Sequence, residues 1–596
     1  MSAEDRTCQN CKRDFSIEPE DFLFYEKMKV PPPTFCPDCR LQRRMAWRNE
    51  RAFFQNTCAR CGNKGVSVYA PESGIVVYCR PCWWSDSWDG MDHGVDFDPS
   101  RPFLEQVRDL LYRIPLPDLF GLYTTLENSE YTNMVGYLKN CYFLTMADWN
   151  ENCSYGSYVF HCKDSYDVLM LLDGSERCYE TVNCGKCYKT MFSLDCEGCN
   201  SVIFSKNCTG CSDCIGCVNL HNKQYCIFNI QYTKSEYEER AKEYAPTTRA
   251  RIAQVMAEAQ DFWMRHPNKH IHESHAENVT GDYISNSHNV KNCFNVQELE
   301  NARYCALVLP GKTTDAYDHS HYGISTERIY ETLQVGNKAS NIIASWFVII
   351  DVMNVAYSIF AIGCKDVFGC VGIKKKQYCI LNKQYTREEY ERLRAQIIDQ
   401  MNAVPYVDRN GNTYRYGEFF PVEMSPFAYN ESGAQEYVPL TKEQAVAKGY
   451  TWREQKQSLG RPTIPHDHIP DSASAIPETI TSELLECAHQ GRCNDRCSTM
   501  FKVTRGEIEF YKTMSLPLPA LCPNCRHYVR VAKRNIHTLY ERACGCGGGQ
   551  SVNHTYTNAA DHVHGSNPCP NKFETTYAPE RADIIYCAEC YQKEII

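Results

Sequence analysis

The 596-residue sequence predicts a mainly β protein: two tandem parallel β-helix (solenoid) units with capping helices, flanked by duplicated treble-clef or zinc-ribbon modules. Three observations predict this class. Paired cysteines gather near both ends of the chain, short β-rich runs with cysteines 12 residues apart fill its middle, and each pattern occurs twice. Close cysteine pairs are typical of zinc knuckles, and short strands with evenly spaced turns are typical of solenoids.

The composition narrows the class of protein. Charged residues make up 23% and the net charge is -10, which argues against indiscriminate coating of nucleic acid but leaves room for local basic patches. The N-terminus, MSAEDRTCQN, lacks a basic segment followed by an apolar one, and no apolar run reaches the ~18 residues of a membrane span. We therefore expect a cytoplasmic protein without membrane contact, in which the 36 cysteines bind metal or are buried.

The N-terminal segment carries four C-x-x-C pairs. Two residues between thiolates let a tight knuckle present both sulfurs to one ion, and two knuckles complete a tetrahedral four-cysteine zinc site. Four pairs therefore predict two sites, with these ligands: Cys8, Cys11, Cys36, Cys39, Cys58, Cys61, Cys79 and Cys82.

The C-terminal segment repeats this order. CPDCRLQRR at Cys36 returns as CPNCRHYVR at Cys522, and the 25 residues from Cys11 to Cys36 recur from Cys497 to Cys522. The duplication predicts two further sites, about four structural zinc ions in all, with Cys487 as a spare ligand. The predicted ligands are Cys493, Cys497, Cys522, Cys525, Cys544, Cys546, Cys587 and Cys590.

An insertion follows Cys546 in the second copy and carries His554, His562, His564 and Cys569. The sequence leaves three roles open for it. It replaces a ligand, binds a further ion, or is a polar loop.

Basic residues follow the second knuckle of each copy. Arg40, Arg44, Arg48 and Arg51 fall at i, i+4, i+8 and i+11, so on a helix they form one stripe. Such a stripe suits phosphates, with a solvated surface as the alternative reading. The predicted nucleic-acid contacts are Arg40, Arg43, Arg44, Arg48, Arg51, Arg526, Arg530, Lys533 and Arg534.

The middle of the chain predicts two solenoids. NKQYCIFNIQYTKSEYEER returns as KKQYCILNKQYTREEYERL, and Asn140, Asn152, Asn183 and Asn207 suit turns because Asn tolerates left-handed backbone. Both copies run into a helix that opens with Thr and acidic residues, a cap signature. The expected order begins with a double zinc-ribbon module at 1–95 and a helical connector at 96–127. The first solenoid follows at 128–232, a second helical connector at 233–279 and the second solenoid at 280–386. A helix plus extended linker at 387–486 then leads to the second double zinc-ribbon module at 487–596.

The solenoid cysteines differ from the terminal ones. When Cys226 is set on Cys379, Cys208 falls on Ala361 and Cys199 on Val352. A metal ligand does not exchange with valine, but a small buried side chain does. The comparison favours stacked interior ladders over a metal cluster in CTGCSDCIGC or thiol redox chemistry.

Residues 130 to 460 resemble an uncharacterised family of large cysteine-rich proteins of candidate-phyla (Patescibacteria) bacteria. The motifs NKQYCIFN, GDYISNSHNVKNC, KKQYCILNKQYTREEYE and GEFFP carry the resemblance. The family has no established activity, so the resemblance implies no catalytic residues.

The sequence favours a non-enzymatic zinc-binding scaffold whose basic zinc-ribbon helices contact RNA or the ribosome. The alternative is a protein assembly scaffold without nucleic acid, with partners on the solenoid faces. A third reading, a carbohydrate-active β-helix enzyme, would draw on Asp148, Asp164, Asp167 and Asp173. The oligomeric state is not predicted.

Overall fold

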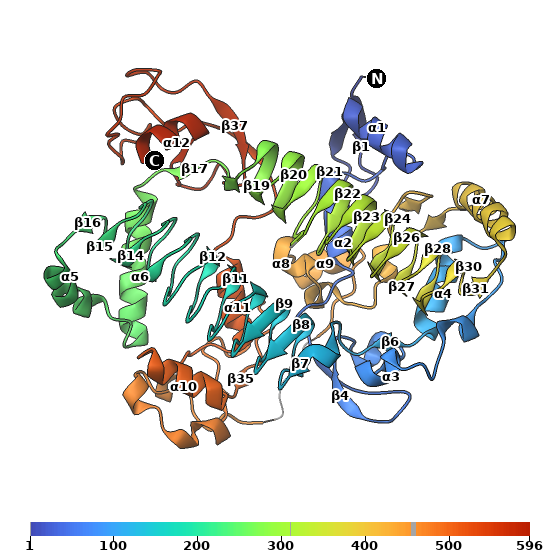
Figure 1. Cartoon of the computed structure of the whole chain (residues 1–596), viewed down its shortest axis with the longest axis horizontal. Coiled ribbons are helices and arrows are strands. Elements are labelled where there is room, and N and C mark those ends of the chain that lie inside the picture. Colours follow the sequence, from blue (N-terminus) through green and yellow to red (C-terminus); the bar gives the residue numbers. More distant parts are fainter. Residues whose placement is uncertain (1, 310, 455–459, 596) are drawn as a thin grey trace.

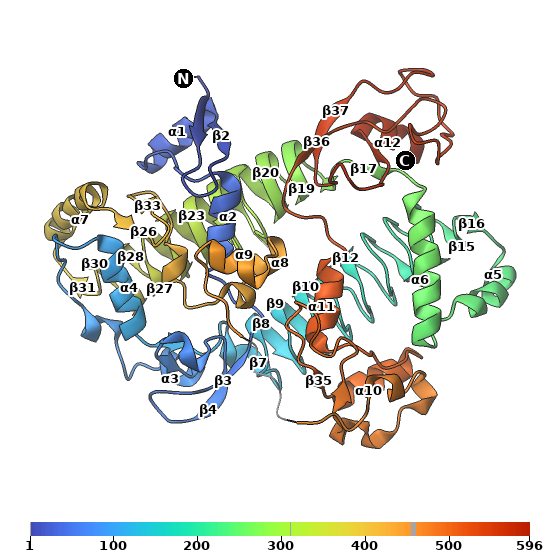
Figure 2. The ribbon, with the colours of Figure 1, turned by 180° about the vertical axis from the view of Figure 1, so that it is seen from behind.

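Parallel strands dominate the structure, a computed structural model described for residues 2–309, 311–454 and 460–595. They form two stacks, which we call the first parallel array (126–231) and the second parallel array (273–384) (Figure 1). The chain is thus mainly β, as the sequence predicts. The stacks lie apart along most of their length, with helices and hairpins from both chain ends against them (Figures 1 and 2).

The strands of the first array are short. They are β7 (Leu126–Glu127), β8 (Asn133–Lys139), β9 (Thr145–Glu151), β10 (Ser157–Phe160), β11 (Leu169–Leu172), β12 (Val182–Gly185), β13 (Asn200–Ile203), β14 (Ser212–Ile215), β15 (Gln224–Ile227) and β16 (Ile230–Gln231). Most successive strands pair in parallel with an offset of 12 residues, as in Ser157↔Leu169 and Ser212↔Gln224, while β11 and β12 are offset by 13 and β16 pairs antiparallel to β15. Single bridges such as Val182↔Leu194 continue the same register between β12 and β13.

The second array contains longer strands. They are β18 (Glu273–Ser274), β19 (Glu277–Ser285), β20 (His288–Gln297), β21 (Leu299–Arg303), β22 (Thr313–Ser320), β23 (Thr326–Gly336), β24 (Ala339–Ile343), β25 (Trp346–Ile349), β26 (Val352–Ala356), β27 (Ile359–Ile362), β28 (Lys365–Phe368), β29 (Val371–Lys374), β30 (Gln377–Ile380) and β31 (Lys383–Gln384). The offset is 13 in Ile329↔Ile342 and 12 in Val367↔Cys379.

The helices and the remaining short strands lie outside the arrays. The helices are α1 (Pro19–Met28), α2 (Pro37–Met45), α3 (Arg80–Trp84), α4 (Phe103–Arg113), α5 (Lys234–Arg240), α6 (Arg249–Met264), α7 (Arg387–Ala403), α8 (Ala434–Tyr437), α9 (Lys442–Ala447), α10 (Arg505–Thr513), α11 (Pro523–Val531) and α12 (Ala588–Ile595). The strands are β1 (Glu4–Thr7), β2 (Asp14–Ile17), β3 (Phe54–Thr57), β4 (Lys64–Ser67), β5 (Val77–Tyr78), β6 (Leu116–Pro117), β17 (Asn268–Lys269), β32 (Tyr406–Val407), β33 (Thr413–Tyr414), β34 (Leu485–Glu486), β35 (Met500–Phe501), β36 (Tyr540–Ala543), β37 (Lys572–Thr575) and β38 (Ile585–Tyr586).

The array cysteines are packed inside, as predicted. Cys153, Cys199 and Cys208 are at most 1% exposed and share one apolar cluster with Val159 and Leu171. Their thiols donate to the carbonyl oxygen two residues back, at 3.5 Å for Cys208 Sγ to Lys206 O. Burial raises the pKa of Cys153, so this interior thiol stays neutral and behaves as a small apolar group.

The predicted turn and cap residues are confirmed. Asn140 and Asn152 adopt positive φ, and their amides form a ladder in which Asn140 Nδ2 donates to Asn152 Oδ1 at 3.2 Å. Helix α5 begins after Thr233 and α7 after Thr386, each with a reciprocal Thr–Glu capping box. Both helices pack a tyrosine against the last parallel strand of their array, with ring centroids 5.8 Å apart in each case.

Candidate metal centres and buried arginine networks

The terminal cysteines gather into four groups whose sulfur atoms lie within 4.8 Å of one another. In each group a knuckle lies opposite the start of a helix, since Cys36 and Cys522 are the N-cap residues of α2 and α11. The groups are Cys8, Cys11, Cys36 and Cys39; Cys58, Cys61, Cys79 and Cys82; Cys487, Cys497, Cys522 and Cys525; and Cys544, Cys569, Cys587 and Cys590.

One hydrogen bond recurs in all four groups and fixes which cysteines correspond. The backbone N–H of Cys36 donates to Cys8 Sγ at 3.3 Å, and that of Cys522 donates to Cys487 Sγ at 3.2 Å. The same bond joins Cys79 to Cys58 and Cys587 to Cys544, at 3.2 Å in each pair. The first knuckle sulfur of every group is therefore positioned by the helix that supplies the second pair.

This correspondence corrects two ligand assignments made from spacing. Cys487, treated as a spare, occupies the place of Cys8, while Cys493 lies beside the group with its Sγ 3.6 Å from Cys525 Sγ. Cys569, from the insertion, completes the last group, and Cys546 falls in a different cluster. The sequence spacing misassigned these ligands because long loops separate Cys487 from Cys497 and Cys544 from Cys569. The nearest cysteine in sequence is therefore not the partner in space.

The groups fit tetrahedral zinc. Four thiolates 2.3 Å from one ion lie about 3.8 Å apart. The observed sulfur separations are 3.6 Å for Cys11–Cys36, 3.7 Å for Cys61–Cys79 and 3.9 Å for Cys487–Cys525. Burial opposes ionisation of Cys58, yet backbone N–H donors, including that of Cys61, lower its pKa to about 6, which favours the thiolate that a metal requires.

Helix α2 does not expose its arginines. Arg40 and Arg44 are at most 1% exposed, and they pair with Asp318 of β22 at 2.9 and 3.0 Å. Arg43 pairs with Glu331 of β23 at 2.8 Å and with Glu418 at 3.2 Å. The N-terminal cysteine module is therefore bound to the second array by a buried charge network.

Helix α11 repeats this network on the first array. Arg526 and Arg530 pair with Asp167 at 3.2 and 3.0 Å, and Arg530 also pairs with Glu180 at 2.7 Å. Arg526 and Arg530 correspond to Arg40 and Arg44 in the duplicated module. The two helices are thus crossed: α2 and α11 each pack on the array that is farther from them in sequence.

Aromatic contacts are duplicated in the same way. Phe24 of α1 stacks on Tyr317 with centroids 3.8 Å apart, and Phe510 of α10 stacks on Tyr166 at 4.4 Å. A sequence signal for these docking sites exists, because YD at 166–167 and YET at 179–181 recur as YD at 317–318 and YET at 330–332. The spacing of 13 residues from Asp to Glu is the same in both copies.

The other predicted nucleic-acid contacts also have partners inside the chain. Arg48 donates to Glu50 and Gln334, and Arg51 donates to Ser157. Lys533 lies 3.6 Å from Glu180, and the Arg534 guanidinium covers the ring of Tyr437. The expectation of a solvent-facing basic stripe is therefore wrong for Arg40, Arg43, Arg44, Arg48, Arg526 and Arg530, all of which are buried.

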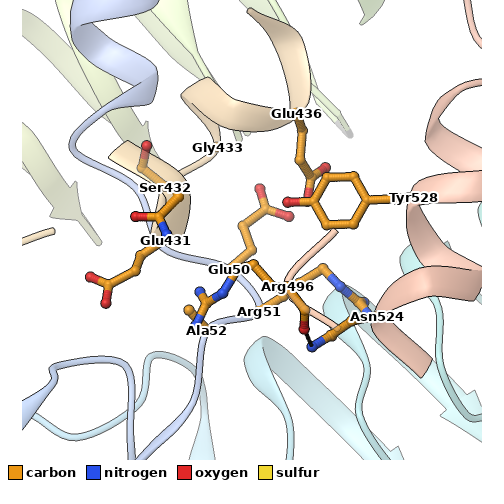
Figure 3. Close-up of a pocket in the computed structure, with 11 residues that line it drawn as sticks. Glu50, Arg51, Ala52, Glu431, Ser432, Gly433, Glu436, Arg496, Asn524 and Tyr528 are labelled. Carbon is orange, nitrogen blue, oxygen red and sulfur yellow. Dashed lines mark hydrogen bonds between the residues drawn. The ribbon is translucent and has the colours of Figure 1, made fainter. Parts of the chain in front are cut away.

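A small pocket lies where the N-terminal module, the C-terminal module and residues 430–436 come together (Figure 3). Glu50 and Arg51 come from the first module, Glu436 from α8, and Tyr528 from α11. Burial lowers the pKa of Arg51 to about 10. Despite burial, His527 and the nearby arginines hold the pKa of Glu436 at about 2, so the pocket contains fixed opposite charges.

The four candidate acids of the enzymatic reading do not share a site. Asp167 is buried between Arg526 and Arg530, and Asp164 accepts a bond from Asn152 in the amide ladder. Asp148 alone of the four lines an apolar pocket between the arrays, where burial raises its pKa to about 6.

No family model and no curated protein matches the chain. Among solved structures, one described as a "putative acetyltransferase" from Desulfovibrio desulfuricans G20 covers 44% of this chain and 68% of its own, with 10% identity and a TM-score of 0.10. An overlap this weak carries no argument about fold or function. In the described part of the chain no helix combines the length and the apolar character that crossing a bilayer requires.

The buried His319 beside the α2 network predicts an acid sensitivity. Burial lowers its pKa to about 4, whereas an unfolded histidine titrates near 6.5. Between these values the unfolded chain binds a proton that the folded chain does not, so stability falls as the pH falls through this window. We expect His319→Gln to flatten the pH dependence by up to about 1.4 kcal/mol per pH unit in denaturant titrations.

The matched control is His288→Gln, which changes an exposed histidine of the same array. Its pH dependence is expected to equal that of the wild type. A His319→Gln slope equal to that of the wild type would contradict the assignment.

Proposed function

We propose that the chain is a zinc-binding scaffold in which two β-solenoids, the parallel arrays, are held together by treble-clef zinc modules. The observation that carries this proposal is the crossed, duplicated docking of α2 and α11. Each zinc site orders the start of a helix, and that helix places arginines against carboxylates of an array. All-thiolate sites suit a reducing compartment such as the cytoplasm.

Removing zinc tests the scaffold. A chelator is expected to release α2 and α11 from the arrays, because the short helices lose the ion that fixes their first turn. Small-angle X-ray scattering of the full chain would then report a larger radius of gyration, restored when zinc is added back. An unchanged radius after complete zinc removal would contradict the proposal.

A protein partner fits this geometry better than RNA or the ribosome. Every basic residue expected to contact phosphates has an acceptor or an aromatic ring within the chain, so those helices are occupied in the folded state. Tyr137 and Trp149 instead present exposed stacked rings 3.9 Å apart on neighbouring strands of the first array, with His161 continuing the stack. Exposed aromatic side chains are enriched at protein interfaces.

The two kinds of partner can be separated with the purified full chain. We expect its ultraviolet absorbance ratio to be that of bare protein, and cross-links to a partner protein to concentrate near Trp149 and to disappear in Trp149→Ala. Bound nucleic acid that is retained in Trp149→Ala would favour RNA. The exposed Val563→Ala, far from these rings in sequence, is a control expected to keep the cross-links.

A further inference from the structure

A second cluster of metal-ligating side chains lies beside the last four-cysteine group. Cys546, His562, His564 and Cys590 bring their ligand atoms within 4.8 Å of one another. Cys546 follows the knuckle at Cys544, the two histidines come from the insertion, and Cys590 lies in the first turn of α12. Two imidazoles with two thiolates are a common ligand set for structural zinc.

His564 is oriented as a metal ligand. Its Nδ1 lies 2.6 Å from the backbone oxygen of Asn567, so Nδ1 carries the hydrogen and the lone pair is on Nε2. That Nε2 lies 3.4 Å from Cys590 Sγ, close to the about 3.6 Å expected for a sulfur and a nitrogen on one tetrahedral zinc ion.

His562 is buried without a hydrogen bond to its Nε2 in the described part of the chain. Its side chain is 1% exposed, and the nearest carboxylate oxygen, on Glu594, is 3.6 Å away. A buried polar nitrogen without a hydrogen bond costs roughly 1–3 kcal/mol. A cation bound by the cluster would offset this cost.

Cys546 is positioned by hydrogen bonds. It is fully buried, and Asn558 Nδ2 donates to its Sγ at 3.3 Å. Its backbone oxygen accepts from the N–H of Cys569 at 2.9 Å, which ties this cysteine to the neighbouring group. These contacts fix the position of the Cys546 sulfur in the cluster.

Cys590 belongs to both groups, since it also lies with Cys544, Cys569 and Cys587. We propose that this module holds two zinc ions that share the Cys590 thiolate. Five thiolates and two neutral imidazoles around two Zn²⁺ ions leave a formal charge of −1, against −2 for one ion with four thiolates. The second ion therefore reduces the buried negative charge while it fixes the insertion to α12.

This inference rests on the proposed zinc-binding role, and native mass spectrometry of the full chain separates the two. We expect five zinc ions per chain, and four in His562→Gln/His564→Gln. The control His554→Gln changes an exposed histidine of the same insertion and is expected to keep the wild-type count. A double variant with the wild-type count overturns the inference, and a wild type without zinc overturns the proposed function as well.

Cadmium substitution tests the shared sulfur even if the double variant does not fold. With ¹¹³Cd in the wild-type chain, two resonances are expected to show scalar coupling to each other through the Cys590 thiolate. If all resonances are uncoupled, the ions do not share a ligand and the binuclear site is overturned.

Discussion

Replacing Asp318 with alanine is expected to lower the free energy of unfolding by roughly 3–5 kcal/mol. The substitution leaves Arg40 and Arg44 buried without the carboxylate that they share. Their guanidinium groups then lose a counter-charge while they remain out of contact with water. Denaturant titration of the full chain measures the loss. Hydrogen exchange is expected to show increased exchange in α2, because this helix is held on β22 by these pairs.

Asp315→Ala is the matched control for this prediction. Asp315 lies on the same strand and pairs with Lys27 at the surface, so its removal is expected to change stability by no more than about 0.5 kcal/mol. Adding Arg40→Met to Asp318→Ala should restore much of the lost stability, since Arg43 and Arg44 then balance the two remaining carboxylates, Glu331 and Glu418. If Asp318→Ala were as mild as the control, the network would not hold the module.

Cys522→Ala is expected to remove one zinc ion and to release α11 from the first array. Cys522 is both a sulfur donor of its group and the N-cap residue of the helix that carries Arg526 and Arg530. Loss of this ion therefore separates the arginines from Asp167, and their buried pairing is lost as well. Native mass spectrometry counts the ions, and thermal unfolding of the same sample reports the destabilisation.

The contrasting variant is Cys208→Ala, which alters a fully buried cysteine of the first array. The second array has Ala361 at the corresponding position. We expect Cys208→Ala to keep every zinc ion and to lose about 1 kcal/mol of stability, the ordinary effect of a small cavity. Equal zinc loss in the two variants would show that interior and terminal cysteines have the same role.

Much of the fold could be predicted because its signals are local. The 12-residue spacing of cysteines, the Asn residues at left-handed positions and the Thr–Glu caps depend on short segments, and the structure has them where the sequence places them. The six C-x-x-C pairs of the four sulfur groups are equally local. The docking of the modules depends instead on contacts between distant segments, although the recurring YD and YET pairs mark where it occurs.

The sequence by itself predicted that the terminal cysteines form groups able to hold metal, and it determined that the interior cysteines replace aliphatic side chains. Only the tertiary structure decided that Cys487 and Cys569, rather than Cys493 and Cys546, complete the sulfur groups. It also decided that the arginines of α2 and α11 face carboxylates of the arrays instead of solvent. The physical reason is that a stripe of charge on a helix has the same local sequence whether its counter-ions are phosphates or carboxylates hundreds of residues away, and only the packing of distant segments selects between them.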